Sequence, residues 1–121
     1  MTPTEIYEEA FERSDPVWPE DHEWENVHDG QVPRVADIAR LIERHINASE
    51  VIVLVHTPVG IGARLARDRA ANYIANHVLE ADIQVSDPLY TCFVAILRSG
   101  VATGWAKATH KPVPYRFPGD A

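Results

Sequence analysis

Apolar residues recur every three or four positions in three segments of the chain, which is the spacing of amphipathic helices. The first predicted helix covers residues 4–11, with Thr4 as its N-cap. The second covers 33–47, since Pro33 suits a first helical turn. The third covers 61–79 and places small alanine side chains toward the core. The apolar stripe of the first helix consists of Ile6, Tyr7, Ala10 and Phe11, and that of the second of Val35, Ile38, Leu41, Ile42, His45 and Ile46.

Strand patterns occupy the remaining ordered segments. Residues 51–55 form an unbroken β-branched and leucine run, typical of a strand that is covered on both faces. Residues 81–85 form a short strand, and strand, helix and strand together predict a parallel βαβ crossover. Residues 89–97 and 101–108 predict a hairpin that turns through 98–100. In the last of these strands, alternate positions are only alanine or glycine, which leaves room for a helix or for another chain.

These elements predict an α+β or small α/β fold, a two-layer or partly three-layer sandwich. Its core would be a four-stranded mixed sheet with two main helices and a short N-terminal helix. The 121 residues suffice for one domain, which we divide into an acidic arm (1–31), a body (32–109) and an extended proline-rich tail (110–121). Either the two main helices lie on opposite faces of the sheet, or the N-terminal segment covers one face.

Charge is concentrated in the first 30 residues, which hold ten acidic side chains and one basic one, Arg13, for a balance of −9. The other residues hold ten basic and eight acidic side chains, so the net charge of the chain is −7. Such an arm disfavours direct nucleic-acid binding and favours a basic protein partner. Trp18 and Trp24 indicate that this segment is pinned to the body or to a partner. The predicted partner-binding residues are Trp18, Glu20, Asp21, Glu23, Trp24 and Glu25.

Composition excludes several other classes of protein. No apolar run approaches the roughly 20 residues that span a bilayer, and the N-terminus lacks the features of a signal peptide, so we expect a cytoplasmic protein without membrane contact. The single cysteine, Cys92, excludes an internal disulfide framework and a zinc site of several thiolates. We expect no cofactor and no catalytic residue set, and a homo-oligomer is compatible with the sequence.

The turn after the first strand is the best candidate for a ligand site. A glycine-containing turn that leads from a strand into a helix presents backbone N–H groups to phosphate. It lacks the third glycine of the dinucleotide fingerprint and the lysine of a P-loop, so an ordinary helix start is the favoured interpretation. The candidate ligand-binding residues are His56, Thr57, Gly60, Gly62 and Arg64.

The other histidines and the single cysteine are further candidates for chemistry, without strong support. His77 lies on the inward stripe of the third helix, and Cys92 lies within an apolar strand, so both are expected to be structural. A nucleophile pair of Cys92 with His56 or His77 has no support from spacing. His22 and His28 are six residues apart, which suits neither a helical metal pair nor a compact chelating turn, so we predict no metal site there.

The leading functional hypothesis is a small acidic, non-catalytic interaction protein: an inhibitor or regulator of a larger basic protein, of the kind that phages and mobile elements encode, or an immunity protein for a toxin. An alternative is a binder of a nucleotide or phosphorylated small molecule at Gly60–Gly62. A third is a structural subunit of a phage-type assembly, suggested by the small-residue strand face and the extended tail.

Overall fold

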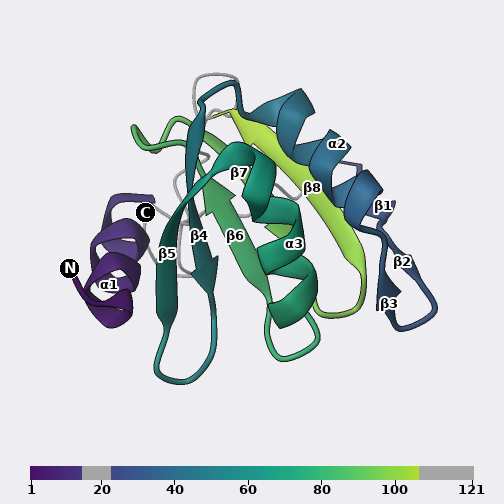
Figure 1. Ribbon diagram of the computed structural model, residues 1–121, viewed down its shortest axis with the longest axis horizontal. Coiled ribbons are helices and arrows are strands. Elements are labelled where there is room, and N and C mark those ends of the chain that lie inside the picture. Colours follow the sequence, from purple (N-terminus) through teal and green to yellow (C-terminus); the bar gives the residue numbers. More distant parts are fainter. Residues whose placement is uncertain (15–22, 107–121) are drawn as a thin grey trace, which may run out of the picture.

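The computed structural model describes residues 1–14 and 23–106, which form a mixed α and β structure (Figure 1). The helices of the described part are α1 (Pro3–Ser14), α2 (Val35–His45) and α3 (Arg67–His77). The main sheet has six strands in the order β1-β8-β7-β6-β4-β5, and β2 pairs with β3 in a separate hairpin. The strands are β1 (Glu25–Asn26), β2 (His28–Asp29), β3 (Val32–Pro33), β4 (Glu50–Val55), β5 (Ile61–Ala66), β6 (Ile83–Ser86), β7 (Cys92–Ile96) and β8 (Val101–Ala106).

The sheet separates two apolar clusters. On one face, α2 and α3 pack against alternate residues of β4, namely Val51, Val53 and Val55. On the other face, Ile52 and Leu54 join a smaller cluster that α1 covers. In Figure 1, α2 and α3 cross the front of the sheet. Helix α1 lies beside the edge strand β5, at the left of the view. The β-branched run is therefore buried on both faces, as predicted, and the N-terminal segment covers one of them.

The segment 61–66 corrects the sequence prediction. It is not the start of a helix but strand β5, which pairs antiparallel with β4 so that Ala63 lies opposite Val53. The helix begins only at Arg67. Because β6 also pairs antiparallel with β4, the predicted parallel crossover between these two strands is wrong. The sheet is also larger than the predicted four strands, and each of its pairs is antiparallel.

The ends of the helices differ slightly from the predictions. Helix α1 is capped by Thr2 rather than Thr4: the Thr2 hydroxyl accepts a hydrogen bond from the Glu5 backbone nitrogen at 3.1 Å. The Glu5 carboxylate in turn accepts one from the Thr2 nitrogen at 3.3 Å, which completes a capping box. Helix α2 starts two residues later than predicted, because Pro33 belongs to β3. The hairpin through 98–100 is confirmed.

Candidate functional site

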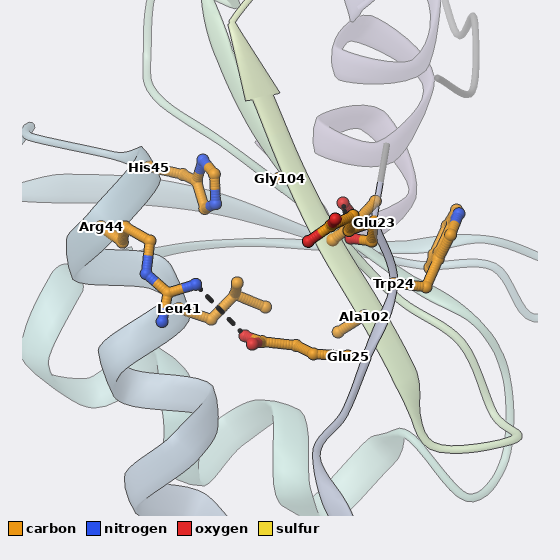
Figure 2. A pocket seen from close by; sticks show the side chains of 9 residues that line it. Glu23, Trp24, Glu25, Leu41, Arg44, His45, Ala102 and Gly104 are labelled. Carbon is orange, nitrogen blue, oxygen red and sulfur yellow. Dashed lines mark hydrogen bonds and ion pairs between the residues drawn. The ribbon is translucent and has the colours of Figure 1, made fainter. Parts of the chain in front are cut away.

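A cleft lies between α2 and the edge of the sheet formed by β1 and β8 (Figure 2). Its volume is about 450 Å³. Arg44 and His45, from the last turn of α2, stand on one side, and Glu23 and Glu25 stand on the other. The remaining lining residues are Trp24, Leu41, Ala102, Thr103 and Gly104. The cleft therefore places groups of opposite charge on facing walls.

The extended segment that carries the two glutamates explains their orientation. Successive side chains of a strand point to opposite faces, and Glu25 lies opposite Ala102, whose side chain belongs to the cluster under α2. The Thr103 hydroxyl donates a hydrogen bond to the Glu23 backbone oxygen at 2.9 Å, so this segment follows β8 beyond the short strand. Trp24 consequently points to the other face, where it packs, partly buried, against the cluster with Trp105.

The predicted partner-binding residues are thus divided. Glu23 and Glu25 are exposed at the cleft, whereas the Trp24 ring covers the opposite face of the sheet. Trp18, Glu20 and Asp21 lie outside the described residues, as does the predicted tail of residues 110–121.

The floor of the cleft depends on small residues of β8. A Cβ atom at Gly104 would overlap the ring of His45, so glycine lets the end of α2 approach the sheet. The alternation of alanine and glycine in β8 therefore leaves room for a helix, as predicted, and that helix is α2. Glu25 and Arg44 form the ion pair across the opening at 3.5 Å, with side chains that are 46% and 58% exposed.

The predicted phosphate turn is a different structure. Residues 56–60 connect two antiparallel strands, so this turn leads into a strand and not into a helix. A Cβ at Gly62 would lie 2.6 Å from the Tyr7 backbone nitrogen, and one at Gly60 would overlap the Tyr7 ring. Both glycines are therefore needed for the docking of α1, and Tyr7 occupies the space beside them. The structural premise of the phosphate site, a helix that starts at the turn, is wrong.

Arg64 and His56 are also separated from each other. Arg64 lies opposite Ile52 in the middle of the hairpin, and its guanidinium donates to the Glu50 carboxylate at 2.7 Å. That hydrogen bond raises the pKa of Arg64 above its usual value. His56 instead follows Val55 at the opposite end of β4. The turn therefore brings together His56, Thr57, Gly60 and Gly62, but the arginine is committed elsewhere.

His56 forms a contact that the sequence analysis missed. Its Nδ1 atom is 2.8 Å from the Tyr7 hydroxyl, and the rings of Tyr7 and Phe11 approach it edge-on. Its Nε2 atom is buried and has no hydrogen-bond partner among the described residues. Burial lowers the pKa of the imidazole below its usual value, and the nearby Asp82 carboxylate opposes this shift.

No family model matches the chain, and comparison with curated proteins and with solved structures finds no match. The function must therefore be argued from the geometry of the site.

The remaining candidates for chemistry do not converge. Cys92 is partly exposed at the start of β7, near the end of the sheet where Glu50 lies, whereas His56 is at the other end. His77 packs its ring at 4.5 Å from that of Tyr73. Within residues 1–14 and 23–106, no three His, Cys, Asp or Glu side chains are placed to hold a metal ion. No helix in the same ranges is long and apolar enough to cross a membrane.

Sequence reasoning missed the α2 side of the cleft. His45 was counted as one more position of the apolar stripe, and Arg44 was not considered. The signal that was available is the alternation of Glu23, Trp24 and Glu25, which has the period of a strand. Such a short alternation does not reveal its partner strand, so the facing wall could not be named from the sequence.

Proposed function

We propose that the protein is a non-catalytic interaction protein, an inhibitor or regulator that binds a larger protein with a basic surface. The observation that carries this proposal is the outer face of α1. Glu5, Glu8, Glu9 and Glu12 are all exposed, and their spacing of three and four residues aligns them along one side of the helix. Among the described residues, Glu9 of this row forms an ion pair with Arg13, whose Nη1 atom is 3.5 Å from the Glu9 Oε1 atom.

The row is held in a fixed orientation because the opposite side of α1 is docked. Ala10 is buried in the smaller apolar cluster, and Ile6 and Tyr7 pack against the same cluster. A rigid row of carboxylates concentrates negative potential, which accelerates encounter with a basic surface and guides its orientation. Phe11 is 45% exposed beside this row and adds an apolar contact surface.

Glu23 and Glu25 form a second, separate exposed group at the opposite edge of the sheet, where Glu25 pairs with Arg44. Trp24 contributes packing against the sheet, so we do not assign it the role of a binding anchor. The anchor role of Trp18 stays a prediction, as do the contributions of Glu20 and Asp21.

Neither alternative function gains a specific supporting observation. The nucleotide hypothesis relied on a helix N-terminus at Gly62, where a strand is found instead. The assembly-subunit hypothesis relied on the small-residue face of β8, which α2 covers, and on the tail of residues 110–121, which lies outside the described residues. The interaction hypothesis is supported by the four exposed glutamates on one side of α1, of which Glu9 is paired with Arg13.

The experiment is quantitative affinity capture from an extract of the native host at low and high salt. The test variant replaces Glu5, Glu8, Glu9 and Glu12 by Gln, which keeps the capping hydrogen bond possible at position 5. The control variant neutralises the same number of exposed acids elsewhere, at Asp29, Glu43, Asp68 and Glu80.

We expect a protein with a basic surface to be captured by the natural sequence and the control, and to be lost with the test variant and at high salt. Equal capture by the test and control variants would refute the role of α1. Absence of any salt-sensitive basic partner would refute the proposed function.

A further inference from the structure

We propose that the cleft between α2 and β1 binds a small zwitterion, a molecule of the amino-acid class that carries an ammonium group and a carboxylate a few ångströms apart. This site is separate from the glutamate row of α1. The inference therefore does not rest on the proposed interaction with a basic protein, and each can fail without the other.

The size and composition of the cleft suit a small molecule. Its volume of about 450 Å³ lies within the usual range of ligand pockets. The floor of the cleft consists of three buried residues, Leu41, Ala102 and Gly104. Charged groups stand above this floor on both sides, as expected of a site that holds a ligand in one orientation.

The charges select for a ligand with two opposite groups. The Arg44 guanidinium is on the α2 wall, and N–H groups of this kind donate to a carboxylate. The Glu23 and Glu25 carboxylates are on the facing wall and suit an ammonium group. A ligand with only a carboxylate would face two glutamates, and a ligand with only an ammonium group would face the Arg44 guanidinium.

The walls are positioned before a ligand arrives. The Thr103 hydroxyl ties the backbone of Glu23 to β8 at 2.9 Å, and Glu25 lies in register with Ala102. On the opposite side, Leu41 is buried in the main core and anchors α2. A prepared site loses less conformational entropy when it binds its ligand.

The ion pair between Glu25 and Arg44 is the group that a ligand would rearrange. Its 3.5 Å separation and exposed side chains make it a weak interaction. A ligand carboxylate can therefore bind Arg44 while the ligand ammonium takes its place beside Glu25. The exchange gives Arg44 and Glu25 new partners of opposite charge, and the ammonium group also faces Glu23. A metal ion is a poorer occupant, since no three metal-ligating side chains of the described residues converge here.

The test is isothermal calorimetry of the full chain with the standard L-amino acids. For each amino acid that binds, two analogues are measured: the amide, which keeps only the ammonium group, and the N-acetyl derivative, which keeps only the carboxylate. We expect at least one free amino acid to bind saturably and both of its analogues to bind at least about tenfold more weakly.

Variants locate the site. Arg44→Met and Glu23→Gln should each weaken binding at least about tenfold. The control Arg40→Met changes the same helix at a residue that pairs with Asp37 and does not line the cleft, so its affinity should match that of the natural sequence. Circular dichroism checks that each variant is folded.

The proposal is overturned if no amino acid binds at millimolar concentration, or if an amide or N-acetyl analogue binds as tightly as the free amino acid. It is also overturned if Arg40→Met weakens binding as much as Arg44→Met, because the ligand would then lie elsewhere on α2.

Discussion

The Tyr7 hydroxyl lies 2.8 Å from Nδ1 of His56 and joins helix α1 to the end of strand β4 across 49 positions of sequence. The Tyr7 ring also fills the space left by Gly60, and Phe11 stacks on the Tyr7 ring at a centroid distance of 5.8 Å. The N-terminal helix is therefore attached by a polar contact that is surrounded by rings. This contact ties the acidic face of α1 to the body of the protein.

Removing the hydroxyl should weaken this attachment. We expect Tyr7→Phe to lower the free energy of unfolding by about 1 kcal/mol, since it removes one partly buried hydrogen bond and leaves His56 Nδ1 without its partner. Urea denaturation measures the effect, and a double-mutant cycle with His56→Leu isolates the coupling between the two side chains. Additive effects of the two substitutions would contradict the assignment.

Stability should decline as the pH falls below about 6.5. Burial lowers the pKa of His56 in the folded protein, so the unfolded chain binds a proton first as the pH falls. The free energy of unfolding should decrease between the unfolded and folded pKa values, by at most about 1.4 kcal/mol per pH unit for one histidine, and then level off. Above that window the contribution is fully present. Urea denaturation at a series of pH values measures the slope.

His28 provides the comparison for the pH experiment. It is buried in β2, and both burial and the charge of Arg34 lower its pKa, so it titrates in the same direction. His56→Gln should remove part of the pH dependence of the free energy of unfolding, and His28→Gln should remove another part. A slope that is unchanged in His56→Gln would show that this imidazole is protonated equally in both states.

Gly62 should tolerate no side chain because the backbone of α1 lies against it. A Cβ there would lie 2.6 Å from the Tyr7 nitrogen, so we expect Gly62→Ala to cost about 2 kcal/mol of folding free energy. The matched control is Gly30→Asn, at a position with φ of 64° and open space around it, where Asn is tolerated. Thermal melts compare them, and equal midpoints would contradict close packing of α1 on β5.

Trp24→Ala should destabilise the fold by about 2 kcal/mol, because its ring packs partly buried against the cluster with Trp105 and Phe93. The denaturation midpoint in urea measures this loss. Glu23→Ala, on the adjacent exposed position, is the control and should leave the midpoint nearly unchanged. If Trp24→Ala melts like the natural sequence, the ring is free for a partner and the anchor hypothesis regains support.

The strongest hydrophobic patterns predicted their elements correctly, whereas residues 61–66 did not. The run at 51–55 is apolar at every position because both faces of β4 are covered. In β5, the residues Ala63 and Ala66 match helical spacing with Ala70, and alanine, arginine and leucine all favour helices. The strand forms because it pairs along its whole length with β4, a tertiary interaction that overrides local propensity.

The candidate cleft was even less accessible to sequence reasoning. Glu23 and Glu25 were identified from charge density, but their orientation follows from the pairing of β1 with β8. Arg44 and His45 enter the site only because Gly104 admits the end of α2. The alternation of Glu23, Trp24 and Glu25 is too short to identify β8 as the partner strand. The pairing that creates the cleft therefore could not be predicted from the local sequence.

The pairing of β1 with β8 also sets an order of events during synthesis. The hydrogen bond between Thr103 and Glu23 joins residues 80 positions apart, so the Glu23 segment can pair only after β8 has been synthesised. Such long-range closure slows folding, and until it occurs an edge of β7 or β8 is open to pairing with other chains. The dense negative charge of the waiting N-terminal segment repels neighbouring copies during this interval.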